Sequence, residues 1–322
     1  MFDSNCSGFV FLLMVDAIVT WVDGEDPLHR RRRAERRRSL GQEAHRSALE
    51  EKRFVSCGEI RYCLRSIHNF APWINRVFLV TDRQIPQCID PVLAYKNGIV
   101  IVDHRQIFSG YEEFLPTFNS MSIETLMWRI EGLSERVVYI NDDFFFSRPV
   151  VESEFFSESG FTVTADAKNV SEKREEDLFN KGLINAARAV CVDTSVYLRP
   201  VHAPQPMTLS VVEGFKNYYG LNRYHENSRY PFRDERQFQP MAAFNCYAVW
   251  GLGYPVRKPS LRQYARWPKR PRSLGGRLKR FMIGRHYPAS FCINEFAREA
   301  ERVPDLERWL SKVTGPPAPF EV

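Results

Sequence analysis

The sequence predicts an α/β protein in which a mainly parallel sheet is flanked by helices and followed by a less regular C-terminal part. The first observation is the order of segments in residues 1–150, where strand-like and helix-like stretches follow one another as β-α-β-β-α-β. Such an order is typical of a parallel sheet covered by helices. The second is size and composition, since 322 residues with 44% hydrophobic side chains can bury a core without disulfide or metal staples. From residue 151 onward the periodicity weakens.

The predicted strands are short apolar runs rich in β-branched residues. They cover residues 15–22, 77–80, 99–102 and 137–140. Each run is followed by an acid, namely Asp23, Asp82, Asp103 and the pair Asp142-Asp143. Ligands of open α/β sheets bind beyond the carboxyl ends of the strands, so four such acids favour a polar site that binds a cation. Taken singly, each acid is more typical of a strand terminator or a turn.

Two helices are predicted between these strands. Apolar residues at helical spacing in residues 60–67 indicate an amphipathic helix that stops near Pro72. The second follows Asn119, a suitable cap, carries apolar residues on one face through residues 123–130 and stops at Gly132. A further amphipathic helix is expected at residues 305–313.

Asn141-Asp142-Asp143 is the candidate metal site. Successive side chains of a strand point to opposite faces, so the two carboxylates converge only if the strand ends there. Carboxylate oxygens suit Mg²⁺ or Mn²⁺, which also bind substrate phosphates. The sequence therefore predicts one of these ions as cofactor.

Residues 21–27 (WVDGEDP) follow the first predicted strand. Trp21 could stack on a base or sugar ring while Asp23 or Asp26 accepts hydroxyl groups. A core tryptophan beside two turn-forming acids explains the same pattern equally well. Arg61 and Arg65 lie four residues apart and could clamp a diphosphate, or simply form a solvated helix face.

His202 lies in a loop, residues 200–206, that contains three prolines. Prolines would hold the loop extended, so a neutral imidazole there could take the proton from an attacking hydroxyl. A single loop histidine is more often structural.

Positive charge is concentrated in two segments. Residues 30–38 contain seven Arg and one Glu, and residues 256–285 contain eleven Lys or Arg and no acid. The net charge is +6, yet the remaining residues carry 27 basic and 38 acidic side chains, or −11. We expect a solvated helix for the first segment. For the second we expect contact with an anionic polymer or, peripherally, with the inner face of a membrane.

The sequence disfavours several functional classes of protein. Dinucleotide, Walker, GxSxG, HExxH and zinc motifs are absent from the sequence. Nucleic-acid binding is not expected, because no nucleic-acid motif is present and residues 30–38 lack aromatics. Seven scattered cysteines and the missing basic leader before the apolar run 9–15 favour a cytoplasmic protein with reduced thiols.

Four segments together resemble the Stealth family of sugar-phosphate transferases. The first conserved region resembles residues 16–27, and the second resembles residues 59–84 with 115–120, 132–135 and 139–143. The third and fourth match more loosely, over 202–233 and 291–321. Glu295 stands where the family usually has Asp, which weakens the transfer of a metal role to that position.

The resemblance implies a nucleotide-sugar-transferase-like fold of the GT-A or Rossmann-like kind. Residues 1–150 would form the nucleotide-sugar-binding core, and residues 151–322 the acceptor-side part of the same catalytic unit. The implied reaction moves a hexose-1-phosphate from a nucleotide diphosphate sugar to a sugar hydroxyl, as in capsule or exopolysaccharide synthesis. The partners would be the nucleotide-sugar donor and an oligosaccharide or polysaccharide acceptor.

The resemblance also implies roles for individual residues. His202 would be the general base, Arg233 would stabilise phosphoryl charge, and Asp143 would act in catalysis. Metal ligands would be Asp142, Asp143 and, more weakly, Glu295. The donor site would comprise Trp21, Asp23, Gly24, Asp26, Arg61, Arg65, Asp82, Gln84, Asn119 and Ser120. Two alternatives remain open: a conventional nucleotide-sugar glycosyltransferase and a polyanion- or nucleic-acid-binding protein.

Overall fold

Five strands form the central sheet of the computed structural model, which describes residues 14–40, 58–171 and 177–322. The spatial order is β10-β4-β1-β2-β3. Strands β1 (Val15–Thr20), β2 (Ile74–Thr81), β3 (Ile99–Asp103) and β4 (Arg136–Asn141) are mutually parallel, and β10 (Gln205–Thr208) adds an antiparallel edge. The predicted strands and the mainly parallel sheet are confirmed.

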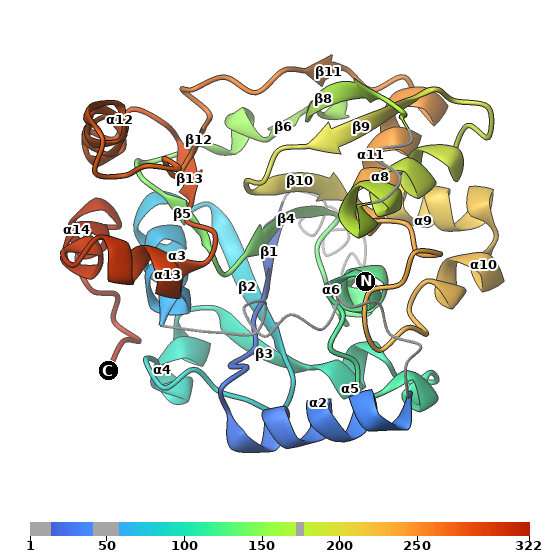
Figure 1. Cartoon of the computed structure of the whole chain (residues 1–322), viewed down its shortest axis with the longest axis horizontal. Coiled ribbons are helices and arrows are strands. Elements are labelled where there is room, and N and C mark those ends of the chain that lie inside the picture. Colours follow the sequence, from blue (N-terminus) through green and yellow to red (C-terminus); the bar gives the residue numbers. More distant parts are fainter. Residues whose placement is uncertain (1–13, 41–57, 172–176) are drawn as a thin grey trace, which may run out of the picture.

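Helices cover the sheet on its two sides and across one end (Figure 1). They are α2 (Pro27–Ser39), α3 (Glu59–Phe70), α4 (Pro91–Lys96), α5 (His104–Ile107) and α6 (Ser120–Leu126). The predicted cap is present, since Asn119 Oδ1 accepts the Met121 amide at 3.1 Å. The helix after Asn119 is shorter than predicted, because it tightens into a 3₁₀ turn at Met127–Arg129 before the chain becomes extended at Ile130.

Residues beyond 143 add short elements around this core. The strand β5 (Phe144–Phe146) joins β12 (Tyr264–Arg266) and β13 (Ser290–Cys292) in one small sheet, and β8 (Val163–Asn169), β9 (Val196–Pro200) and β11 (Val256–Arg257) form another. A short hairpin pairs β6 (Phe156–Ser157) with β7 (Gly160–Phe161).

The helices of this part are α8 (Leu178–Arg188), α9 (Leu209–Tyr219), α10 (Leu221–Glu226), α11 (Pro240–Cys246), α12 (Leu274–Gly284), α13 (Phe296–Arg302) and α14 (Leu306–Val313). The last confirms the predicted C-terminal helix. A π-helical turn, Tyr247–Gly251, extends α11. One hydrophobic cluster joins both parts of the chain, from Val15 in β1 to Phe320 near the C-terminus.

The basic segment 30–38 lies within α2 and is only partly solvated. Arg33 is 7% exposed, and Arg32 forms an ion pair with Asp82 at the end of β2. Cys63, Cys88, Cys191, Cys246 and Cys292 are free thiols, whereas Cys6 and Cys57 lie outside the described residues, as does most of the run 9–15. Among the helices described, none has the length and apolarity to cross a bilayer.

Candidate functional site

The turn Asn141-Asp142-Asp143 lies where the central sheet meets the small sheet of β5, β12 and β13. It connects β4, which lies between β1 and the edge strand β10 of the central sheet, to β5, which pairs antiparallel with β13. The backbone carbonyl of Asp143 accepts the Ile293 amide at 3.2 Å, so the turn is fixed from both sheets. Asp142 and Asp143 are half-buried.

His202 reaches this turn because of the pairing between β10 and β4. Gln205 lies opposite Tyr139 in an antiparallel register, so the loop that leads into β10 and carries His202 enters beside the carboxyl end of β4. The His202 Nε2 atom lies 3.5 Å from Asp143 Oδ2, and its ring meets Phe144 edge-on with centroids 4.6 Å apart. The His202 side chain is 40% exposed, so the imidazole is accessible to solvent.

Cys292 approaches the same carboxylate from β13. Its Sγ lies 3.2 Å from Asp143 Oδ2 and 2.7 Å from Asn294 Oδ1. Burial, together with the negative charge of Asp143, raises the pKa of Cys292 well above its ordinary value. The group is therefore a neutral thiol that donates to Asp143. Ligand atoms of Asp143, His202 and Cys292 all lie within 4.8 Å of one another.

Asp142 has different neighbours. Burial raises its pKa well above the ordinary value, and the charges of Glu59 and Asp143 raise it further. Glu59 is the first residue of α3 and is 6% exposed. The turn thus places three carboxyl groups, from Glu59, Asp142 and Asp143, in one electronegative region.

The donor atoms at the turn fit a hard divalent cation. Within the described part of the chain, Asn141 Oδ1 and Asp143 Oδ1 are buried and have no hydrogen-bond partner. Buried acceptors without partners are costly, and carboxylate and amide oxygens are the ligands that Mg²⁺ and Mn²⁺ prefer.

Glu124 is a site residue that the sequence analysis missed. Burial raises its pKa from an ordinary 4.5 to about 7, against the opposing effects of Arg233, Tyr139, His202 and Ser120. The Gln239 Nε2 atom donates to Glu124 Oε2 at 3.0 Å. The available signal was that Glu124 is the one acid in the apolar stretch 120–130.

Arg233 and Ser120, both predicted, are brought together beside Glu124. The Arg233 Nη2 atom donates to Ser120 Oγ at 2.8 Å, and Arg233 lies close enough to Glu124 to lower the pKa of that carboxyl. His202 contributes to the same electrostatic environment. The effect of His202 on the pKa of Glu124 indicates that Glu124 lies near the cluster of Asp143, His202 and Cys292.

The predicted donor residues at the ends of β1 and β2 are tied to each other. Gln84 Oε1 accepts the Asp23 amide at 2.9 Å, and Gln84 Nε2 donates to the Asp23 carbonyl at 2.8 Å. Trp21 is 6% exposed and packs into the core, while its amide donates to Val80. Gly24 lies in the adjoining turn and is buried.

Several other predicted residues have structural partners. The carboxylate of Asp26 caps α2 by accepting the His29 amide at 2.7 Å. The Arg32 guanidinium contacts both oxygens of Asp82, at 3.1 Å and 3.0 Å. Asn119 Nδ2 donates to Gln237 Oε1 at 2.8 Å.

Arg61, Arg65 and Glu295 have partners other than Asp143, His202 and Cys292. Arg65 is buried in an ion pair with Glu321, and Arg61 donates to the Val322 carbonyl at 3.0 Å. Glu295 lies at the start of α13 with a left-handed backbone (φ 55°) and pairs with Arg298 at 2.8 Å.

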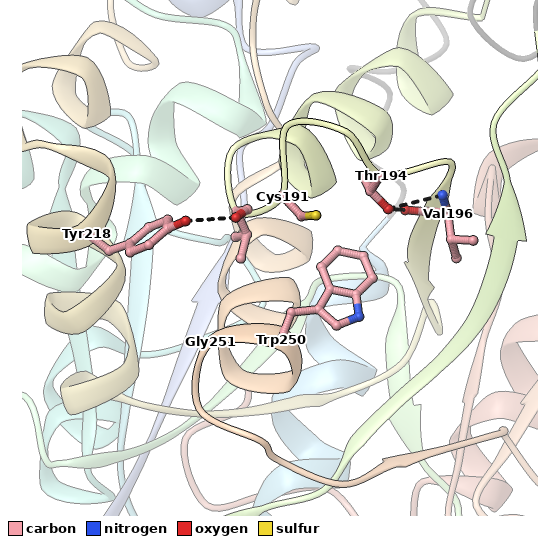
Figure 2. Close-up of a pocket in the computed structure, with 7 residues that line it drawn as sticks. Cys191, Thr194, Val196, Tyr218, Trp250 and Gly251 are labelled. Carbon is pink, nitrogen blue, oxygen red and sulfur yellow. Dashed lines mark hydrogen bonds between the residues drawn. The ribbon is translucent and has the colours of Figure 1, made fainter.

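A pocket of about 640 Å³ lies elsewhere on the surface, between the α8–β9 loop and the π-helical turn (Figure 2). The Tyr218 hydroxyl donates to the Val190 carbonyl at 2.8 Å on one side, and Trp250 forms the other. None of its lining residues is charged or belongs to the predicted site.

Comparison with known proteins identifies two conserved regions. Residues 15–41 match conserved region 1 of the Stealth proteins, and residues 53–164 match conserved region 2. An exopolysaccharide phosphotransferase of Nocardia farcinica is 31% identical over 95% of this chain and 61% of its own length. The receptor polysaccharide phosphotransferase WefC of Streptococcus oralis is 38% identical over 45% of this chain and 42% of its own length.

Among solved structures, mouse xyloside xylosyltransferase 1 covers 87% of this chain and 97% of its own, with 10% identity and a TM-score of 0.40. The chain spans 22–61% of the length of the curated relatives that it matches. Asp23 and Gln84, and the pair Asp142-Asp143, all fall within the matched regions. The chain thus contains segments that match conserved regions 1 and 2 of the Stealth proteins.

Proposed function

We propose that the protein transfers a hexose-1-phosphate from a nucleotide diphosphate sugar to a hydroxyl of a glycan acceptor. The observation that carries the proposal is the convergence of His202, Asp143, Arg233 and Glu124 at one end of the parallel sheet. Relatives named exopolysaccharide and receptor polysaccharide phosphotransferases support the same chemistry. The free thiols fit a reducing compartment, so we place the reaction in the cytoplasm.

In the proposed step, His202 accepts the proton of the acceptor hydroxyl. The oxygen attacks the phosphorus that bears the sugar, the phosphoanhydride bond breaks, and its electron pair leaves with the nucleoside monophosphate. Asp143 lies 3.5 Å from His202 Nε2 and stabilises the imidazolium that forms. Phosphoryl transfer of this kind depends mainly on positioning and charge neutralisation.

Arg233 supplies positive charge to the phosphoryl oxygens in this proposal. Its guanidinium donates to Ser120 Oγ and lies close enough to Glu124 to lower the pKa of that carboxyl. A deprotonated Glu124 holds Arg233 in place through charge, and Gln239 fixes Glu124 in turn at 3.0 Å. Glu124 is thus a positioning residue, and Arg233 is the group that meets substrate.

A divalent cation, Mg²⁺ or Mn²⁺, would be held by Asp143 and Asn141, whose buried oxygens have no hydrogen-bond partner in the described residues. Asp142 would add negative charge from the other side of the turn. When bound, such an ion neutralises diphosphate charge. Glu295 pairs with Arg298, so we assign it no ligand role.

The donor's nucleotide would lie over the ends of β1 and β2. There the paired contacts between Asp23 and Gln84 fix two loops against each other, and Asp82 anchors α2 through Arg32. Trp21 packs beneath them. Asn119 supports Ser120 from the α6 side.

A panel of nucleotide sugars, each incubated with the protein, Mg²⁺ or Mn²⁺ and an oligosaccharide acceptor, tests the proposal. Mass spectrometry should detect a nucleoside monophosphate and a phosphodiester-linked product. Release of a nucleoside diphosphate with a glycosidic product would instead identify a conventional glycosyltransferase. The Asp143→Asn protein is the matched control, because it keeps the shape of the turn but lacks the charge.

A further inference from the structure

Helix α12 has an apolar face on the outside of the molecule. Leu274, Leu278 and Phe281 are 87%, 60% and 57% exposed. Their spacing of four and three residues places them on one side of the helix. Ile283, on the opposite side, is fully buried. The helix therefore has two apolar faces, and only the inner one packs against the described protein.

Packing fixes the orientation of α12. The Arg280 guanidinium lies over the rings of Trp267 and Trp309, at 5.6 Å and 5.9 Å, and 3.5 Å from Asp305. The helix packs against α14 at the edge of the molecule (Figure 1). Because the inner face is anchored at Arg280, the leucines and the phenylalanine cannot turn inward without breaking these contacts.

Positive charge surrounds the outer face. Arg277 and Arg285 are exposed, and the Arg285 guanidinium lies 5.1 Å from the Phe281 ring centroid. Lys269, Arg270 and Arg272 precede the helix and are exposed as well. Residues 256–285 contain no acid, and among the described residues Arg280 alone of their eleven cations has a carboxylate within 4.0 Å.

We propose that α12 is an interfacial helix that binds an anionic lipid surface. Leu274, Leu278 and Phe281 would enter the acyl region, while the surrounding cations contact lipid phosphates. Exposed apolar residues ringed by cations are the combination that interfacial helices use. A soluble polyanion would contact the cations but gain little from the three apolar side chains.

Vesicle flotation tests this inference without donor or acceptor, so its outcome is independent of the proposed reaction. The full chain should float with mixed phosphatidylcholine–phosphatidylglycerol vesicles and much less with phosphatidylcholine alone. The triple variant Leu274→Gln, Leu278→Gln, Phe281→Gln should bind at least about tenfold more weakly. Arg277→Gln with Arg285→Gln should lose about fivefold per arginine, and only on anionic vesicles.

A matched control replaces three exposed apolar residues elsewhere, Val92, Tyr95 and Val192, by Gln. This variant should bind vesicles like the wild type, and circular dichroism should show all variants folded. Equal binding by the α12 triple variant, or no vesicle binding by the wild type, overturns the proposal. The proposal is also overturned if neither the wild type nor the triple variant binds vesicles and both bind dextran sulfate. Self-association that the triple variant abolishes, without vesicle binding, would assign the face to a second copy.

Discussion

The ends of β3 and β4 carry the same sequence signal, a buried strand that runs into aspartate, yet the two acids have opposite surroundings. Asp103 accepts the Arg83 amide at 2.8 Å and the Arg105 amide at 2.9 Å, and it forms a capping box with Gln106. Burial would raise the pKa of Asp103, but the hydrogen bonds from Arg105 and Arg83 lower it overall. Asp143 keeps one buried oxygen with no partner among the described residues.

The difference in hydrogen bonding between Asp103 and Asp143 suggests a criterion that separates structural acids from acids available to a ligand. An acid whose hydrogen bonds are all made locally stabilises the chain and has nothing left for a ligand. Asp142 and Asp143 instead sit beside another carboxyl, Glu59, and the pKa of Asp142 is raised. A folded protein tolerates such crowding at a place where substrate or a cation supplies the missing charge.

The largest expected effect is on turnover, when Asp143, the acid that we propose to be functional, loses its charge. Asp143→Asn should lower kcat by about three orders of magnitude, because it removes the partner of His202 and a metal ligand together. Nucleotide release measured by mass spectrometry checks the change, with circular dichroism to show an intact fold. Wild-type activity that persists in excess EDTA would contradict the metal role.

His202→Ala should lower kcat by about 10²–10⁴-fold and leave donor affinity unchanged, because His202 is expected to act on the acceptor hydroxyl. Isothermal titration with the nucleotide diphosphate sugar and steady-state kinetics separate the two quantities. His225→Ala is a matched control, since His225 contacts Tyr111 on another face. A loss confined to donor binding would assign His202 to the donor instead.

Glu124→Gln should change the pH dependence of stability. The pKa of Glu124 is about 7 in the folded protein, above its ordinary 4.5. A raised carboxyl pKa stabilises the fold below pH 4.5, and this stabilisation is lost as pH rises through 7. The resulting fall in the free energy of unfolding is about 3 kcal/mol. Urea unfolding measures the free energy of unfolding at pH 5 and at pH 8. Between these pH values it should fall more for wild type than for Glu124→Gln. Parallel pH profiles of the two proteins would rule out the raised pKa.

The smallest effect is expected from the structural acid. Asp103→Ala should lower the free energy of unfolding by about 1 kcal/mol, since it removes the cap of α5, while kcat stays unchanged. Urea unfolding and the nucleotide-release assay measure the two quantities. A fall in kcat comparable to that of Asp143→Asn would erase the distinction between the two strand ends.

Much of the central sheet could be predicted from the sequence, because its signals are local. β-branched runs predicted β1 to β4, and the cap at Asn119 predicted where α6 begins. The predicted end of this helix at Gly132 was wrong, since α6 ends at Leu126 and a 3₁₀ turn follows at Met127–Arg129. The short strands β10 and β13 carry too few residues for a periodic signal, and both are defined by their partners.

The candidate site was less predictable from the sequence, because its side chains are brought together by the pairing of strands that are distant in the chain. His202 was expected in a rigid loop, but its distance to Asp143 depends on how β10 pairs with β4. Cys292 reaches Asp143 through the pairing of β13 with β5, a contact across 149 residues of chain. Glu124 carries no motif, and only its burial beside Arg233 distinguishes it from a surface glutamate.

The antiparallel pairing of β10 with β4 also makes the spacing of the chain matter more than its composition. Two residues lie between His202 and Gln205, which pairs with Tyr139. Each residue advances a strand by about 3.3 Å and turns the next side chain to the other face. A single inserted or deleted residue there would therefore swing the imidazole away from Asp143. Substitutions in β10 that keep its backbone pairing should be tolerated better than a change in the length of this stretch.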